Sequence, residues 1–428
     1  MAGIERLAMT LDPVHVDGIA ELAGRVTRQV DDSDHTEFAE RAWSELLDPL
    51  YDDSGDVSLE PLGEHRRRKV PIDDVALESR PFPTQHGLDA GTINPTTFKN
   101  GLVIDVSQAA MAAVPSSVDL HRGRTIVMTV HTNDETLDVQ DADWQMDDHG
   151  YARRRILHAP RVDRHEQAVV HALALYRAES EHALDQADLI DDLLVLDGPI
   201  YPTGLLKWVE RDPQLKQLII EEAEFVEVIH NYLKLVESFA ERDVPLVGFV
   251  KNSASKAITR ELREKAGAPW VDDEAFFRRV LERPDEHGEP RTDALTFTGW
   301  FRSRVGADGM LADGTIDLDR DVHLDDEDYE VTFFVVYDPR DDLVYRVEAP
   351  YAVTRNPEVR EKVMTQLLSE IAAERGPPLA VGKADELARI DREGKQTLRR
   401  RIEREFDTSQ QESYNDKRWG AAEGFDLV

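Results

Sequence analysis

The chain has 428 residues, a length that fits one large domain or two domains of medium size. It carries 86 Asp and Glu against 51 Lys and Arg, a formal net charge of −35, and only 12 of the basic residues are Lys. Because Cys is absent, the composition excludes a disulfide framework, a thiol nucleophile and a Cys-based zinc or iron–sulfur site.

The acidic residues are dispersed, and 41% of all residues are hydrophobic, which favours a folded core over a disordered polyanion. With so few Lys, this composition indicates adaptation to a salt-rich cytoplasm. Salt at 1 M shortens the Debye length to about 3 Å, so the net charge does not exclude a nucleic-acid partner. We see no signal peptide and no apolar run of roughly 18 residues, and we therefore expect a cytoplasmic protein without membrane contact.

The first part of the chain reads as helical. Apolar residues recur at spacings of three and four over residues 12–50, whereas residues 51–64 are typical of a loop. A basic patch, HRRRK, follows from His65 to Lys69. We therefore expect an N-terminal helical region over residues 1–80.

From about residue 85 the pattern changes to short β-type runs. Three strands are predicted as a meander, followed by one long helix, at residues 87–92, 100–113, 123–132 and 163–188. Two continuous apolar runs come next, at 191–200 and 244–253, separated by a helical stretch at 205–241. Such runs, buried on both faces and alternating with helices, favour a parallel or mixed sheet. This order is the outline of an RNase H-like α/β sheet flanked by helices.

The last part of the chain completes that fold. Residues 268–328 are irregular and acidic, typical of an insertion, and 331–353 predict a hairpin turning at Pro339–Asp342. Two more helices are predicted at 356–375 and 384–405, and the end of the chain is polar. We expect an RNase H-like domain over residues 81–400 and a polar tail over 401–428.

Two aspartates stand at predicted strand ends. Asp89 lies in GLDAGT, and Asp197 follows the apolar run LLVL in LLVLDGPI. A charged residue is unexpected at the end of so apolar a strand. A carboxylate at the end of a buried strand costs desolvation unless it meets a cation or several donors. Two such carboxylates on neighbouring strands would bind Mg²⁺ or Mn²⁺, which prefer oxygen ligands. The alternative for each is an ordinary turn residue in solvent.

A third carboxylate could come from the helix between these strands. Glu179 falls with Tyr176 on the apolar stripe of that helix, which favours it over Glu181, on nearly the opposite face. Glu166 is a more distant option, and a solvated helical Glu is the alternative for all three.

Basic side chains could hold phosphate near these acids. Lys251 follows VPLVGFV at the end of the next predicted strand, where a Lys can clamp a phosphate or stabilise an oxyanion. Arg153, Arg154 and Arg155 form a second basic patch, which is either a phosphate path or a set of ion-pair partners for nearby acids.

Taken in order, several motifs resemble the NurA nuclease family in a haloarchaeal form. These are GLDAGT, a helix carrying Glu, LLVLDGPIYPTGLL, VPLVGFVKNS, DLVYRVEAP and PPLAVGKADELARI, across roughly residues 85–392. The resemblance implies a divalent-metal-dependent nuclease with an RNase H-like core, which resects DNA 5′ to 3′ and cuts single strands with Mn²⁺ or Mg²⁺. It also implies a homodimer that docks on a hexameric HerA-type translocase during end resection and double-strand break repair.

The resemblance also implies roles for particular residues. Asp89, Glu179 and Asp197 would hold two cations, with Asp385 of KADELARI as a fourth ligand, and Lys251 matches the Val-Lys of the family. Two alternatives stay open: a catalytically inactive acidic adaptor docked on a translocase, and a metal phosphohydrolase acting on small esters. Convergence of the three carboxylates within metal-bridging distance would favour an enzyme, and a closed pocket rather than an open groove would favour small esters.

Overall fold

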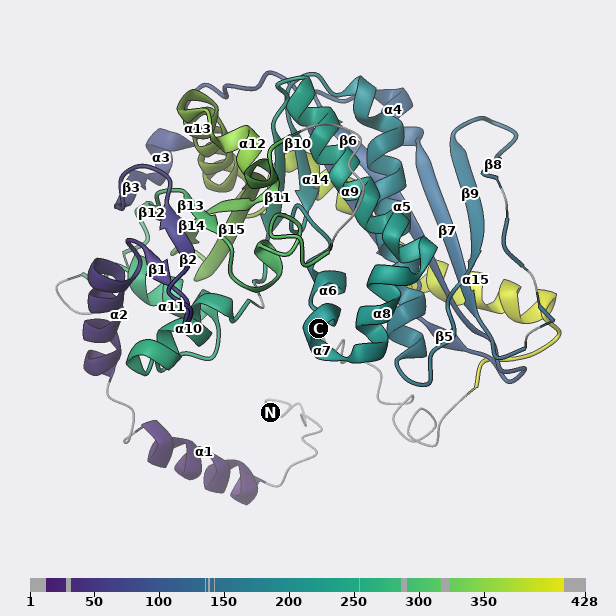
Figure 1. Cartoon of the computed structure of the whole chain (residues 1–428), viewed down its shortest axis with the longest axis horizontal. Helices are drawn as coiled ribbons and strands as arrows, with labels where there is room; N and C mark the ends of the chain where they lie inside the picture. The colour runs from purple at the N-terminus through teal and green to yellow at the C-terminus, as the bar shows by residue number, and fades with distance from the viewer. Residues whose placement is uncertain are drawn as a thin grey trace, which may run out of the picture.

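The strands of the described chain join one mixed sheet. The computed structural model describes residues 13–27, 32–285 apart from 135, 138, 142 and 254, then 291–316 and 324–411. The expected tail from 412 onward and parts of the expected insertion (286–290 and 317–323) therefore lie outside the described residues. Figure 1 shows the helices packed around this sheet.

The central strands have the RNase H order. They are β4 (Gln85–Thr92), β6 (Val103–Val114), β7 (Arg124–His131), β10 (Leu194–Asp197) and β11 (Leu246–Val250). They lie in the order β7-β6-β4-β10-β11, with β6 antiparallel to both neighbours and β10 parallel to β4 and β11. The predicted meander, long helix and two further strands, and with them the fold class, are confirmed.

Helices cover both faces of these strands because β10 is apolar on both faces. Leu194 and Leu196 belong to a core with the helices α5 (Glu166–Gln186) and α9 (Ala223–Glu241). Val195 belongs to a second core with α13 (Pro357–Glu374) and α14 (Leu379–Ala388). A charged residue at the end of such a strand therefore lies between two helical layers.

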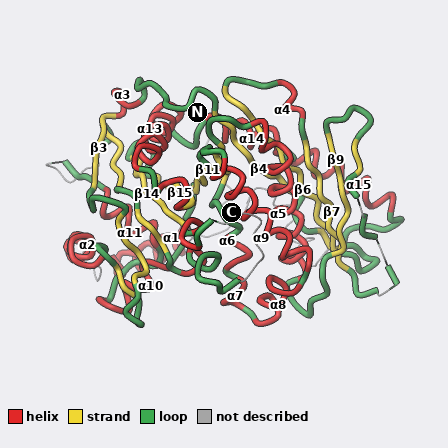
Figure 2. Tube along the Cα trace, turned by 45° about the horizontal axis from the view of Figure 1, so that its top comes forward, coloured by secondary structure: helices red, strands yellow, loops and turns green. Residues whose placement is uncertain are grey.

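The sheet extends at both ends beyond the predicted strands. On one side β9 (Ala152–His158) lies parallel to β7 (Figure 2). On the other side the sheet continues from β11 through β15 (Leu343–Pro350), β14 (Val331–Asp338), β13 (Phe301–Ser303), β2 (Val57–Pro61) and β1 (Leu50–Tyr51), while β12 (Ala294–Thr298) joins β14 to β3 (Arg67–Pro71). The predicted hairpin at 331–353 is confirmed as β14 and β15.

Two expectations are corrected here. Residues 51–64 are not only loop, because β2 lies there and pairs with β13, and residues 268–328 are not wholly irregular, because β12 and β13 lie there. These strands are stabilised by their partners in the sheet, which local sequence does not reveal. The domain boundaries stay a prediction, although β2 and β3 tie the N-terminal region into the same sheet.

Several predicted helices are interrupted. The stretch 12–50 contains α1 (Pro13–Thr27) and α2 (Asp32–Leu46); 205–241 contains α6 (Thr203–Leu206), α7 (Trp208–Arg211), α8 (Pro213–Glu221) and α9; 384–405 spans the end of α14 and α15 (Arg392–Glu405). The breaks have capping residues: Asp212 accepts from the backbone at the start of α8, and Asp391 accepts from the N–H of Gly394.

The shorter elements are α3 (Ile72–Val75), β5 (Thr96–Thr97), α4 (Val118–Arg122), β8 (Gln145–Met146), α10 (Ala257–Ala266), α11 (Asp273–Leu281) and α12 (Tyr351–Thr354), with 3₁₀ turns η1 (Ala187–Leu189), η2 (Gly306–Asp308) and η3 (Asp326–Tyr329). No helix in the described ranges combines the length and apolar character needed to cross a membrane.

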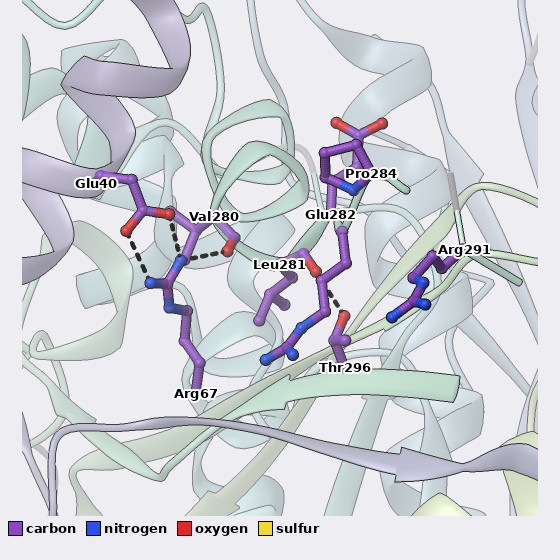
Figure 3. Close-up of a pocket in the computed structure, with 9 residues that line it drawn as sticks. Glu40, Arg67, Val280, Leu281, Glu282, Pro284, Arg291 and Thr296 are labelled. Atoms are coloured by element: carbon purple, nitrogen blue, oxygen red, sulfur yellow. Dashed lines mark hydrogen bonds and ion pairs between the residues drawn. The ribbon is translucent and has the colours of Figure 1, made fainter. Parts of the chain in front are cut away.

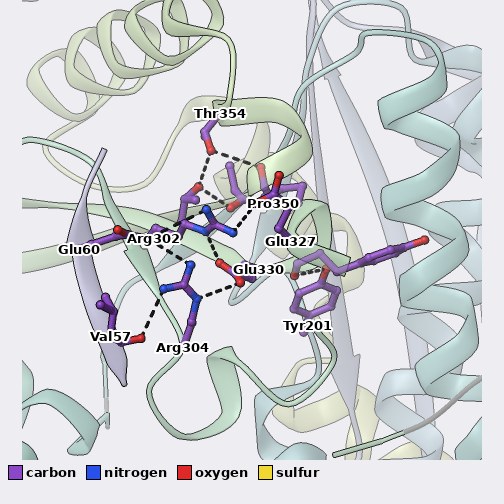
Figure 4. A network of polar contacts seen from close by, with 12 residues as sticks. Val57, Glu60, Tyr201, Arg302, Arg304, Glu327, Glu330, Pro350 and Thr354 are labelled. Carbon is purple, nitrogen blue, oxygen red and sulfur yellow. Dashed lines mark hydrogen bonds and ion pairs between the residues drawn. The ribbon is translucent and has the colours of Figure 1, made fainter. Parts of the chain in front are cut away.

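An ion-pair network fixes the added strands (Figure 4). Arg304 of β13 donates to Glu330 at 2.9 Å and to Glu60 of β2 at 3.1 Å. Arg302 pairs with Glu330 and, at 3.0 Å, with Glu327. Because these charges are shared among several partners and partly shielded from solvent, they hold β13 between β2 and β14 better than isolated surface pairs would.

Candidate active site

Asp89 and Asp197 lie side by side at the carboxyl edge of the central strands. In the parallel register of β4 and β10, Leu88 lies beside Leu196. Asp89 and Asp197 are the next residues of the two strands, and they are therefore neighbours. The two aspartates follow paired positions and so share one face of the sheet, because side chains alternate along strands. The side chain of Asp197 is 14% exposed.

Helix α14 packs unusually close to β4 and brings a third acid to this edge. A Cβ on Gly87 would lie 2.3 Å from the carbonyl carbon of Ala380, and one on Gly91 would lie 2.4 Å from the carbonyl oxygen of Ala388. Only glycine permits this approach. Asp385, on the same helix, comes near enough to raise the pKa values of both Asp89 and Asp197.

The two aspartates are electrostatically perturbed. Burial, followed by the charges of Asp197 and Asp385, raises the pKa of Asp89 to about 6. Burial also raises the pKa of Asp197, although Lys251 opposes this shift. Lys251 donates from Nζ to Oδ2 of Asp197 at 2.6 Å. The ammonium group thus holds one carboxylate of the cluster in its charged form.

Glu179 reaches the same cluster from α5. Burial and the charge of Asp89 raise its pKa to about 8. Tyr232 of α9 donates its hydroxyl to Oε1 of Glu179 at 3.0 Å, which orients the carboxyl group. Sequence reasoning missed Tyr232, because it lies 53 residues from Glu179 in the chain.

A second tyrosine, Tyr176, completes the wall behind Glu179. Burial and Glu179 raise its pKa to about 12, and its hydroxyl takes a hydrogen bond from the backbone of Gly204. A Cβ on Gly204 would lie 2.4 Å from that hydroxyl oxygen, so the contact needs a glycine. The apolar stripe of the predicted helix, on which Tyr176 was noted, could have indicated this residue.

The other glutamates considered for this position face elsewhere. Glu181 pairs with Arg177 at 3.0 Å and lies 3.8 Å from Arg153. Glu166 begins α5, 13 residues before Glu179, a distance of about 20 Å along a helix. The structure therefore selects Glu179 as the helical acid nearest the strand-end aspartates.

The donor set suits a divalent cation. Its members are carboxylates with raised pKa values, so a positive charge placed among them would relieve burial and mutual repulsion. Carboxylate oxygens are also the ligands that Mg²⁺ and Mn²⁺ prefer. Among the residues that the structure describes, no three potential ligands already stand close enough together to hold an ion. Cation binding would thus involve side-chain movement, including that of Lys251.

The NurA domain model matches residues 83–390, which include the RNase H-like strands, Lys251 and the four acids of this cluster. The chain belongs to the NurA family. The resemblance inferred from the motifs is thereby confirmed.

Solved NurA structures are similar to this chain at low sequence identity. The NurA nuclease from Sulfolobus solfataricus is 11% identical, with 93% of this chain and 98% of that chain covered and a TM-score of 0.48. NurA with manganese is 11% identical, with 77% and 94% covered and a TM-score of 0.36. NurA bound to dAMP and manganese is 10% identical, with 78% and 89% covered and a TM-score of 0.38. No curated protein matches the chain in sequence.

Arg153, Arg154 and Arg155 do not form one patch at the NurA carboxylates. They are successive residues of β9, so their side chains alternate between the two faces of the sheet. Arg153 is engaged by Asp185 at 3.0 Å and stacks on Trp144. Three strand spacings separate β9 from β4, about 14 Å. Of the two readings that the sequence left open, Arg153 fits the ion-pair partner, and a DNA contact by these arginines stays a prediction.

The first basic patch also lies away from the carboxylates of the NurA domain. Arg67 of β3 pairs with Glu40 at 2.7 Å and lines a cavity of about 350 Å³ together with Arg283 and Arg291 (Figure 3). Five strand spacings separate β3 from β10, about 24 Å. This patch therefore does not contact Asp89 or Asp197.

Proposed function

We propose that this protein is a divalent-metal-dependent deoxyribonuclease, and membership of the NurA family supports a nuclease. The observation that carries the proposal is the meeting of Asp89, Glu179 and Asp197 at one sheet edge, where each is near enough to perturb another's pKa. Functional sites are where such costly arrangements of like charge are found.

We infer that Asp89, Glu179 and Asp197 hold Mn²⁺ or Mg²⁺, as two ions within one carboxylate cluster, with Asp385 as a fourth ligand. Two bound ions supply an activated water and neutralise charge on the leaving oxygen of a phosphodiester. The protein's own residues prepare this site: Tyr232 orients Glu179, and Lys251 holds Asp197 ionised.

Lys251 has a second role in the proposal. Its side chain is 35% exposed, so it can leave Asp197 and turn toward solvent when a divalent cation takes its place. An ammonium group at the edge of the cluster would then contact a phosphate oxygen of the DNA strand. The same residue would thus stabilise the carboxylates before DNA binds and the phosphate afterwards.

The finer activities and partners extend this proposal. The family resemblance supports 5′ to 3′ exonuclease and single-strand endonuclease activity in end resection, as a homodimer with a HerA-type hexameric translocase. The competing proposal is an inactive adaptor. The raised pKa values favour the enzyme, because an adaptor has no need to hold three carboxyl groups in a costly cluster.

The test is cleavage of single-stranded DNA labelled at the 5′ or the 3′ end, with Mn²⁺ or with EDTA. We expect cutting only with the metal, and a decrease of more than about 100-fold in Asp197→Asn, as for other directly acting groups. The control is Asp191→Asn, which makes the same change at an exposed position before the opposite end of β10. Equal cutting by Asp197→Asn and wild type would refute the site, and a folded wild type inactive even with the translocase would favour the adaptor.

A further inference from the structure

A cavity of about 390 Å³ lies at the ends of β10 and β11, the strand ends that also carry Asp197 and Lys251. Its walls come from the two loops that carry the site: Pro199 stands two residues after Asp197, and Asn252 follows Lys251. Helices α6 and α10 and the turn η2 complete it. This volume is in the range of small-ligand sites. A group bound here would contact residues that neighbour Asp197 and Lys251 in the chain.

The rim of this cavity is cationic. Lys207, Lys256 and Arg260 line it, and none of the three forms an ion pair with a described residue, whereas Glu210 is the acid on the same rim. With Lys251, three of the chain's 12 Lys gather around the ends of β10 and β11. In a chain with a net charge of −35, the three unpaired cations Lys207, Lys256 and Arg260 make the rim of this cavity locally positive.

The carboxylates in the floor of the cavity share a buried arginine. Buried Arg346 donates to Asp308 at 2.7 Å and lies 2.8 Å from Glu348. Oδ2 of Asp308 also accepts from Ser303 at 2.6 Å, and Oε2 of Glu348 accepts from the backbone N–H of Ile200 at 3.2 Å. Lys207 is near enough to lower the pKa of Glu348, whereas Lys256 and Arg260 form no ion pair with a described residue and are available to an anion.

Neutral donors complete the lining. The hydroxyl groups of Thr203, Ser253 and Ser255 stand in the wall beside the cations. Phosphate oxygens accept from ammonium, guanidinium and hydroxyl groups alike, and such contacts position a nucleic-acid strand without reading its sequence.

We propose that this cavity is a phosphate subsite, which binds a phosphate group of the DNA strand next to the bond that is cut. The inference rests on the proposed nuclease function and adds to it the residues that position the strand: Lys207, Lys256 and Arg260. The phosphate is either a terminal one or an internal phosphodiester, and the two share the same chemistry. Lys256, the N-cap residue of α10, and Arg260, one turn into the helix, both line the cavity and can contact the same group.

The test measures binding in EDTA, so that no cutting occurs. Three internally labelled single-stranded 10-mers would be used, with a 5′-phosphate, a 3′-phosphate or no terminal phosphate, over a KCl series in which the protein stays folded. We expect K256Q/R260Q to bind about 10-fold more weakly at the lowest salt. The slope of log affinity against log[KCl] should flatten by about 0.7 for each phosphate that the variant no longer neutralises.

The matched control is R263Q/K265Q, which removes two exposed positive charges from the same helix outside the cavity. We expect it to bind like wild type. Weaker binding of only one phosphorylated 10-mer assigns the subsite to that terminal phosphate, and an equal decrease for all three assigns it to an internal one. Wild-type binding by K256Q/R260Q, or an equal decrease in the control, would overturn the subsite.

The outcome is separable from that of the proposed function. If Asp197→Asn abolishes cleavage while K256Q/R260Q binds like wild type, the nuclease stands and the subsite falls. If K256Q/R260Q weakens binding while wild type does not cut DNA, the subsite stands as a DNA contact of a non-catalytic protein.

Discussion

Replacing Glu179 by Gln should stabilise the metal-free protein, and increasingly so as the pH rises. Burial and Asp89 raise the pKa of Glu179 from 4.5 to about 8. Between these values the folded state holds a proton that the unfolded state has released, so folding is penalised progressively with rising pH. Gln cannot ionise, yet its side-chain oxygen can still accept from Tyr232, so the variant keeps the hydrogen bond and avoids the penalty.

The size of the effect follows from the pKa shift. With pKa values of 4.5 unfolded and about 8 folded, the penalty grows by about 3.5 kcal/mol between pH 5 and pH 8. Because Asp89 is one cause of the shift, removing the Glu179 charge also eases ionisation of Asp89 at high pH. The stability of the variant relative to wild type should therefore rise by a few kcal/mol across this range.

The assay is urea unfolding in EDTA at pH 5, 6, 7 and 8. The control is Glu166→Gln, the same change at the start of the same helix, for which we expect a difference from wild type that stays constant with pH. Added Mn²⁺ should narrow the gap between wild type and Glu179→Gln, since a cation bound to the carboxylates stabilises wild type more. A pH-independent difference for Glu179→Gln would refute the electrostatic account of the cluster.

Two further predictions concern the support of the site. Gly87→Ala should lower the free energy of unfolding by about 1–3 kcal/mol and reduce cleavage, because the added Cβ would lie 2.3 Å from the backbone of Ala380 and displace α14. Thermal melts and the DNA assay test this, and an unchanged melting temperature would contradict the close packing. Burial and the charges of Arg153 and Arg124 lower the pKa of His182 to about 3. Between pH 6.5 and pH 5, the free energy of unfolding of wild type should therefore fall by about 1.5 kcal/mol more than that of His182→Gln. Parallel decreases of the two proteins in urea unfolding would contradict this.

The sequence predicted those strands whose environment is uniform. The run LVLD of β10 is apolar on both faces because both faces are covered, and the hairpin of β14 and β15 has its turn residues in place. In contrast, β9 reads ARRRILH, and its pairing with β7 and with β8 makes it a strand. The same holds for β12 and β13, which lie within an acidic stretch and depend on β14 and on N-terminal strands far away in the chain.

The residues of the candidate site were likewise predictable only where the local sequence determines their position. Asp89 and Asp197 were identifiable because a charge at the end of an apolar strand is costly, and that cost is a property of the local sequence. Glu179 could be preferred over Glu181 because helical periodicity assigns them to different faces. Tyr232 could not be identified, since its role exists only through the packing of α9 on α5. The arrangement of Arg153, Arg154 and Arg155 could not be predicted either, because it depends on their lying in a strand, where consecutive side chains point to opposite faces.

The cluster explains how this fold tolerates several carboxylates at one edge without a divalent cation. A proton on Glu179, whose pKa is about 8, removes one negative charge near neutral pH, and Lys251 compensates another on Asp197. Both compensations are reversible, because a proton can dissociate and a lysine that is 35% exposed can turn away. A divalent cation would replace both at once and free Lys251 toward the cationic rim of the neighbouring cavity. Lys251, which compensates a carboxylate of the metal-free cluster, is thus the residue that a bound metal would release for contact with DNA.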